Sequence, residues 1–258
     1  MSKFNKFMAS ALGVGAAKIN TIVHTKNIMP GKRIEGICKI KGGKVEQYIG
    51  QITIGVFTNY KKEVNDKVIQ EYQKIHSHTI KVDRNVLPNE EFEVNFSFIL
   101  YKRVPVTKQN CEVWLSTGLG IANGIDSTDR DYINVDYNEY MKNTVDAIGE
   151  LGFSLREVEN EYCKARLNNL NFVQEFEFVP TRGVYRGRLD ELEVVFIPTN
   201  THVDILLQVD RKVRGLMSFI SESIGADETN LRIRMENSRK FTKEEIKREI
   251  ETVLRKYS

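Results

Sequence analysis

Three stretches decide the fold of this chain: residues 172–180 read FVQEFEFVP, residues 189–198 read LDELEVVFIP and residues 206–216 read LLQVDRKVRGL. In the first stretch, Glu175 and Glu177 alternate with Gln174, Phe176 and Phe178. A period of two residues is typical of a β-strand with one face in the core and one in water. The sequence therefore predicts a strand here, with its glutamates on the solvent side.

The second and third stretches predict a β-hairpin. Apolar residues recur at every second position from Leu192 to Phe196 and again over 203–209. Pairing Phe196 with Ile205 and Leu192 with Val209 keeps both apolar rows on one face and leaves a four-residue loop, 199–202. A slip of one residue would turn the whole apolar set into solvent, so the pattern fixes the register.

The same register places Asp190 opposite Arg211, one step beyond Leu192 and Val209. A charge on the core side of a sheet is tolerated when it is paired and hydrogen-bonded. Two interpretations stay open. The pair either lies half-solvated at the open end of the sheet or forms a polar core inside the domain.

The rest of the chain is mostly strand-like, with two helical segments. Residues 19–135 show repeated alternation with turn residues between the runs, which is typical of a β-sandwich. Over 137–151 the apolar period becomes helical and Gly152 follows as a stop signal. Near the end, Thr242 and Glu245 form a capping box before a second helix.

These patterns predict a mainly β protein with tandem β-sandwiches, an interdomain helix and short N- and C-terminal helices. The expected division is an N-terminal domain over 1–137, the helix over 138–152, and a C-terminal β-rich domain over 153–258. A chain of 258 residues is long enough for two domains that each bury a core.

Several further motifs carry a resemblance to a known family. They are Lys41-Gly42-Gly43, Val113-Trp114-Leu115-Ser116-Thr117-Gly118-Leu119, Asp129-Arg130-Asp131-Tyr132-Ile133 and Leu151-Gly152-Phe153-Ser154-Leu155-Arg156. With the stretches above, they resemble the bacterial sporulation-control (SpoOM) protein family, over nearly the whole chain. The resemblance implies an arrestin-like fold and a non-enzymatic regulatory role. Arrestins also offer a precedent for a buried polar core such as Asp190 with Arg211.

Composition indicates a protein of the reducing cytoplasm. Hydrophobic residues make up 41% and charged residues 28% of the chain, and no run approaches the ~18 apolar residues of a membrane span. We expect no secretory signal, because the start lacks a continuous apolar core. The three cysteines, Cys38, Cys111 and Cys163, lack the spacing of a disulfide framework or zinc site.

The N-terminal part is basic. Residues 1–44 contain nine bases and one acid, Glu35, so they carry a net charge of +8 and the remainder −5. Within them Phe4, Phe7, Met8 and Leu12 follow helical spacing. This apolar face either folds back on the first domain or makes weak contact with an anionic membrane or a partner.

The residues do not support catalysis or a cofactor. No dinucleotide or P-loop glycine pattern is complete. His76 and His78 would share one strand face, but no third ligand completes a metal site, and we expect a solvated face. Glu175 with Glu177, or Glu191 with Glu193, could serve as a carboxylate pair in a hydrolase. Acidic residues on an outer strand face ordinarily serve only to keep that face solvated. We therefore predict no catalytic, cofactor-binding or metal-binding residues.

Nucleic acid binding is also disfavoured. From 211 to 258 twelve bases face eight acids, and no aromatic residues interleave with the arginines to stack bases. Lys212 and Arg214 fit a basic surface for an acidic protein partner better than a surface that binds nucleic acid. The sequence therefore predicts a cytoplasmic regulator or adaptor that binds proteins, with a membrane-associated scaffold as the alternative and homo-oligomers left open.

Overall fold

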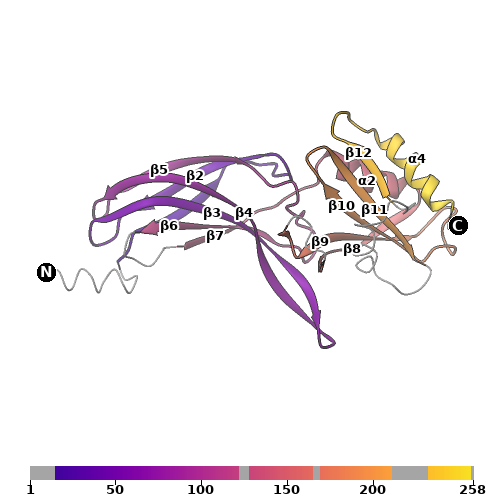
Figure 1. Cartoon of the computed structure of the whole chain (residues 1–258), viewed down its shortest axis with the longest axis horizontal. Helices are drawn as coiled ribbons and strands as arrows, with labels where there is room; N and C mark the ends of the chain where they lie inside the picture. Colours follow the sequence, from indigo (N-terminus) through magenta and orange to yellow (C-terminus); the bar gives the residue numbers. More distant parts are fainter. Residues whose placement is uncertain (1–14, 122–127, 165–168, 211–231, 257–258) are drawn as a thin grey trace. The chain divides into compact units, whose positions relative to one another are not determined.

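The computed structural model describes residues 15–121, 128–164, 169–210 and 232–256. Most of these residues are in β-strands, which confirms the mainly β class (Figure 1). The chain divides into two compact units. The first contains Met1–Thr58, Lys74–Val104 and Glu112–Val135, and the second contains Asn59–Gln73, Pro105–Cys111 and Asp136–Ser258. The sequence analysis expected continuous segments, whereas the second unit takes in the tip of a long hairpin and the helix that follows residue 138.

The first unit is a sandwich of two sheets. One sheet has the order β1-β2-β5, and the other is built on β3, with β6 and then β7 on one side and β4 as a further partner. The strands are β1 (Lys18–Val23), β2 (Arg33–Lys41), β3 (Gln47–Val64), β4 (Lys67–Val86), β5 (Glu91–Ile99), β6 (Val113–Ile121) and β7 (Thr128–Tyr132). Alternate side chains of both sheets, such as Ile34, Phe96 and Ile54, form the buried core between the layers.

The second unit contains one antiparallel run of strands in the order β8-β9-β10-β11-β12. These are β8 (Phe153–Tyr162), β9 (Phe172–Pro180), β10 (Glu191–Pro198), β11 (His202–Asp210) and β12 (Arg232–Glu236). The hairpin register is confirmed, because Phe196 lies opposite Ile205 and Leu192 opposite Val209.

Two helices accompany this sheet, and their ends follow the sequence signals. Helix α2 (Glu139–Glu150) begins where the side chain of Asn138 accepts a hydrogen bond from the Met141 N–H at 3.2 Å. It ends before Gly152, whose φ of +98° disfavours a side chain, and an added Cβ there would come within 2.2 Å of the Arg182 carbonyl oxygen. Helix α4 (Lys243–Leu254) starts with the predicted capping box.

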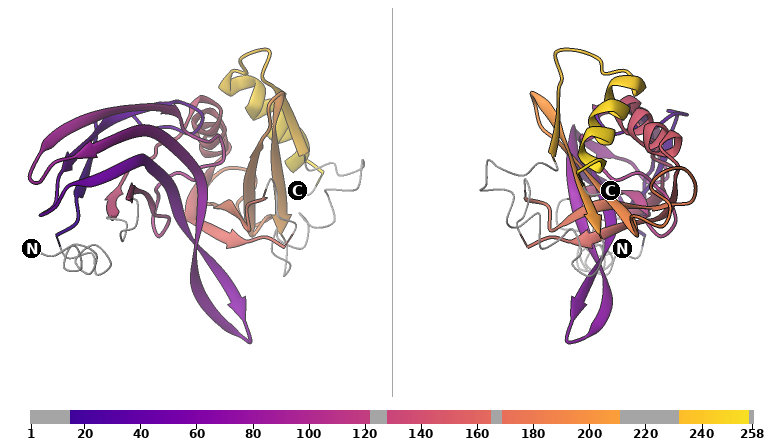
Figure 2. Two further views of the ribbon diagram at one scale, coloured as in Figure 1. Left: turned by 60° about the vertical axis from the view of Figure 1, so that its left-hand side comes forward. Right: turned by 90° about the vertical axis from the view of Figure 1, so that its right-hand side faces the viewer.

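The core of the second unit lies between the sheet and these helices, which cover the same face of the sheet (Figures 1 and 2). Met141 and Ile148 of α2 and Ile250 of α4 join inward-facing residues such as Phe176, whose ring meets that of Phe196 edge-on at 5.4 Å. In the part of the chain that the structure describes, the layer that covers this sheet is formed by helices, whereas the sequence analysis expected a second sheet. Among the described residues, no helix is long and apolar enough to cross a membrane.

Candidate functional site

The outer face of the second unit's sheet carries a dense group of carboxyl groups. Inward-facing residues such as Val158 and Phe176 belong to the core under the helices, so their neighbours along each strand point to the opposite side. On β8, β9 and β10 those neighbours are glutamates. We call this surface the acidic face, and its members are Glu157, Glu159, Glu161, Glu175, Glu177, Glu191 and Glu193.

The strand register sets several of these glutamates directly opposite one another. Glu177 lies between Glu157 of β8 and Glu193 of β10, and Glu159 lies opposite Glu175. Side chains paired in this way on neighbouring antiparallel strands are about 5 Å apart at Cβ, so like charges there repel. The acidic face therefore reduces the stability of the fold unless protons or cations neutralise it.

The acidic face is less exposed than the sequence analysis expected. Glu193 is 6% exposed, and Glu175 and Glu177 are half-buried. The same side of the sheet also holds a small apolar cluster that includes the buried Val173 and Val195. The prediction that these glutamates lie on a fully solvated face was wrong, because alternation shows which residues share a face and not how deeply that face is covered.

Two described cations contact the acidic face. The ammonium group of Lys61, on β3, pairs with Glu159. The guanidinium group of Arg156, on β8, lies 2.6 Å from a carboxylate oxygen of Glu191 and also pairs with Glu177. Among the described residues, these two cations contact Glu159, Glu177 and Glu191.

The remaining charge is reduced by protons. Burial raises the pKa of Glu175 to about 8, and the Glu193 and Glu161 carboxylates add to the rise. Burial, with a hydrogen bond to Glu159, raises the pKa of Glu161 to about 7. The pKa of Glu159 moves the other way, since hydrogen bonds from Lys61, Glu157 and Glu161 outweigh the effect of its burial.

Neutral and ionised carboxyl groups therefore lie side by side on the acidic face near neutral pH. Acid–base hydrolysis uses such a pair of carboxyl groups. The reaction also requires a cavity that holds the substrate. Two pockets in the described part of the chain have other residues around them. No cluster of metal-ligating residues occurs within residues 15–121, 128–164, 169–210 and 232–256. Such an arrangement can also bind a cationic surface, which would replace protons by fixed positive charges.

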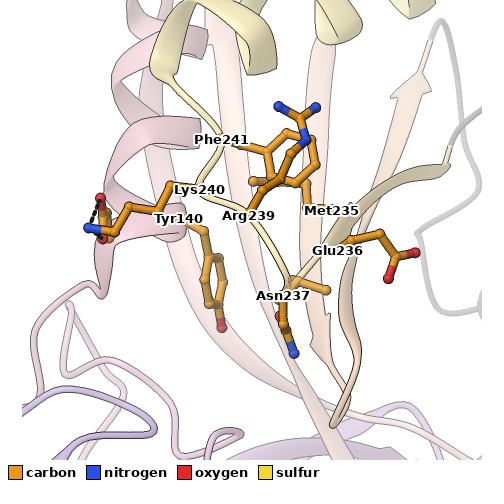
Figure 3. Close-up of a pocket in the computed structure, with 9 residues that line it drawn as sticks. Tyr140, Met235, Glu236, Asn237, Arg239, Lys240 and Phe241 are labelled. Carbon is orange, nitrogen blue, oxygen red and sulfur yellow. Dashed lines mark hydrogen bonds and ion pairs between the residues drawn. The ribbon is translucent and has the colours of Figure 1, made fainter.

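One of those pockets lies in the second unit, beside the start of α2 and the segment that joins β12 to α4 (Figure 3). Its volume is about 160 Å³, enough for a single side chain. Its lining residues are Glu139, Tyr140, Val203, Met235, Glu236, Asn237, Arg239, Lys240 and Phe241. Two cations at its rim have partners within the chain: Lys240 pairs with Glu139 at 3.2 Å, and Arg239 pairs with Glu245 at 2.7 Å while its guanidinium lies 3.8 Å from the centre of the Phe241 ring.

The structure describes one of the residues that the sequence analysis singled out as site candidates. Asp190 directly precedes β10 and is exposed, which agrees with a solvated position at the open end of the hairpin rather than a buried one. Arg211 lies outside the described residues, so its pairing with Asp190 stays a prediction. The other candidates, Phe4, Phe7, Met8, Leu12, Lys212 and Arg214, also lie outside them.

The sequence analysis missed an ion pair with a buried carboxylate on the neighbouring strands. Asp204 of β11 is 8% exposed, and its carboxylate accepts two hydrogen bonds from the Arg234 guanidinium of β12, at 2.9 and 3.3 Å. His202 lies 3.4 Å from the same carboxylate. The alternation of Arg232 and Arg234 with apolar residues indicates that β12 is a strand. The sequence does not show which strand pairs with it.

His76 and His78 also differ from the solvated face that was expected. Both are on β4 in the first unit, and their rings lie 5.9 and 4.9 Å from the ring of Phe98. Burial lowers the pKa of His76. Packing against an aromatic residue of the sandwich core explains both histidines.

The fold and the acidic face together describe a mainly β protein with a cluster of carboxyl groups on one sheet. Comparison with known proteins agrees with the family resemblance. The family model described as SpoOM protein matches residues 4–213. The curated sporulation-control protein spo0M of Bacillus subtilis (strain 168) is 38% identical over 258 residues, which cover 100% of both chains. The crystal structure of Spo0M from Bacillus subtilis matches with a TM-score of 0.83 and 35% identity, over 95% of this chain and 100% of that one. This chain belongs to the SpoOM family.

Proposed function

We propose that this protein takes part in the control of sporulation by binding a partner protein, and that it does so without catalysis. Membership of the SpoOM family supports the sporulation role, because the Bacillus subtilis relative is a sporulation-control protein. The acidic face carries the binding role. Its carboxyl groups lie side by side on three neighbouring strands, so a basic segment of a partner would gain charge pairing and relieve like-charge repulsion.

A charge-matched pair of variants tests the proposal. Glu157→Gln with Glu191→Gln removes two carboxylates from the acidic face while keeping side-chain size. Glu244→Gln with Glu249→Gln removes two exposed carboxylates from α4 and gives the same net charge. Each variant replaces the resident Spo0M in a Bacillus subtilis strain, and the measurements are the count of heat-resistant spores and the proteins cross-linked to the chain in those cells.

We expect the unmodified chain and the α4 variant to restore spores and to cross-link the same partner. The acidic-face variant should lose the partner and the spores together. In cell extracts, cross-linking of the unmodified chain to the partner should weaken with added salt because exposed charges are screened. Failure of the unmodified chain to restore spores would contradict the sporulation role. Equal cross-linking by both variants would show that the partner binds elsewhere.

A further inference from the structure

Two sheet edges meet in the first unit. Strand β1 ends one sheet and β7 ends the other, and the two strands lie side by side without pairing in the part of the chain that the structure describes. A side chain joins them instead. The carboxylate of Asp129 on β7 accepts a hydrogen bond from the Thr21 N–H of β1 at 2.7 Å. We call this junction the seam, and its members are Thr21, Cys38, Thr117, Asp129 and Asp131.

The seam is polar although it faces the core of the sandwich. Asp129 lies opposite Thr117 of β6, and Asp131 lies opposite the fully buried Leu115. Residues paired in this way point to the same face of the sheet, so both carboxyl groups are directed inward. The Thr117 hydroxyl is fully buried and has no hydrogen-bond partner among the residues described. The seam therefore contains more polar groups than its own hydrogen bonds satisfy.

No described cation neutralises the two carboxyl groups. On β7 the titratable group that faces Asp131 is Asp129, and on β2 it is the Cys38 thiol, which burial keeps neutral by raising its pKa to about 11. β1 and β6 contribute the two threonine hydroxyl groups. The guanidinium of Arg130, the next residue along β7, lies over the Trp114 ring at 5.0 Å. Two carboxyl groups in such a place cannot both ionise without repulsion.

The two carboxyl groups share one proton instead. Burial raises the pKa of Asp131 from 3.8 to about 6, and the charge of Asp129 and a hydrogen bond between the two groups add to the rise. In this bond the protonated Asp131 donates to the ionised Asp129, which is also the acceptor for Thr21. Once both groups are ionised, the bond between them is lost and the two charges repel, whereas water would hydrate both charges in an open seam.

We propose that the seam is a pH-sensitive switch, which joins β1 to β7 while its two carboxyl groups share a proton and opens more often once both are ionised. Opening releases the Thr21 N–H and with it the outer edge of β1. The inference is independent of the acidic face, which belongs to the other unit, and of any role in sporulation.

The size of the change follows from proton linkage. In the open seam Asp131 is in water and regains its ordinary pKa of 3.8. Between about pH 4 and about pH 6 the closed seam holds a proton that the open seam has released, so the opening equilibrium rises about tenfold per pH unit. It should therefore rise about 100-fold over this range and stay constant above it.

Amide hydrogen exchange of the full chain, followed by NMR between about pH 4 and about pH 8, tests the switch. Thr21 is the reporter, because its N–H hydrogen bond crosses the seam. After correction for the intrinsic exchange rate, opening at Thr21 should rise about 100-fold. Asp131→Asn cannot ionise and should give no rise. Asp66→Asn is the matched control and should follow the wild type, because Asp66 is exposed at the β3–β4 turn and its φ of 60° suits asparagine equally well.

A second amide separates opening of the seam from unfolding of the whole sandwich. Ile54 is buried on β3, which has partner strands on both sides, so its amide exchanges only on global unfolding. Thr21 should exchange at least about tenfold faster than Ile54 after the same correction. Opening at Thr21 that does not change with pH, a rise that persists in Asp131→Asn, or equal protection of the two amides would overturn the proposal.

Discussion

Replacing Glu175 by glutamine should make the protein more stable in mildly alkaline solution. Glu175 has a pKa of about 8 in the folded protein and about 4.5 as an ordinary glutamate. Between these two values the folded protein holds a proton at Glu175 that the unfolded chain has released, so the free energy of unfolding falls as the pH rises through this window. Glutamine has nearly the same shape and never ionises, so it removes this loss.

The size of the effect follows from the shift. Because one pKa unit corresponds to about 1.4 kcal/mol, a rise from 4.5 to about 8 corresponds to at most about 5 kcal/mol. Side-chain relaxation and water entry reduce such penalties, and we expect a gain of about 2 kcal/mol above pH 8. Below about pH 4 both the folded and the unfolded chain hold the proton, and the variant should match the wild type.

Urea unfolding at a series of pH values measures the difference. The raised pKa values of Glu161 and of Asp131, about 7 and about 6, give slopes of the same sign. Asp131 contributes equally to both proteins and cancels in the comparison, whereas Glu161 interacts with Glu175 and should contribute a smaller slope in the variant. Glu249→Gln, at an exposed position of α4, should leave the wild-type profile unchanged. If the Glu175→Gln variant has the same pH dependence of unfolding as the wild type, or is less stable above pH 8, Glu175 does not hold a proton in the folded protein.

Three further predictions address the second unit and the cysteines. Thr242→Ala removes the capping box of α4 and should lower the free energy of unfolding by about 1 kcal/mol in urea titrations. Arg234→Ala leaves the buried carboxylate of Asp204 without its bidentate partner and should lower the free energy of unfolding by about 2 kcal/mol. We expect a smaller loss than for a fully buried pair because Arg234 is half-exposed. A loss below about 0.5 kcal/mol would show that water replaces the guanidinium. Burial raises the pKa of Cys38 and Cys111 to about 11, and the third cysteine is buried too, so a thiol reagent near pH 8 should react only after denaturant is added.

The hairpin and the helix ends could be predicted from the sequence because local rules determine them. A shift in register would expose Leu192 and Phe196, and the capping box needs Thr242 and Glu245 at a fixed spacing. The layer that covers the second sheet is not local. The period of two in β10 is the same whether helices or another sheet cover it. The sequence analysis therefore expected a second sheet where the described residues place α2 and α4.

The acidic face shows the same limit at the level of a site. The sequence shows the repeated Glu-x-Glu spacing in β8, β9 and β10. The spacing within each strand does not determine that the three strands are neighbours in the sheet. Once they pair, glutamates that look like separate solvating residues become one group with shared protons. Glu175 illustrates the change, because its raised pKa depends on burial and on carboxylates from both adjacent strands.

Lys61 connects the acidic face to the hairpin within the second unit. It is on β3, where the hairpin leaves the sheet, and its ammonium group pairs with Glu159 of the acidic face. Beside it, Tyr60 donates a hydrogen bond to Glu71 of β4 and stacks on Phe172 of β9 at 5.8 Å. A partner cation that binds Glu159 competes with Lys61, and so weakens one of the contacts that fix the base of the hairpin. Lys61→Met removes this competition while leaving the apolar contacts of Tyr60 in place. The variant should therefore bind a basic peptide more tightly than the wild type in a calorimetric titration, and equal affinities would show that Lys61 does not compete for Glu159.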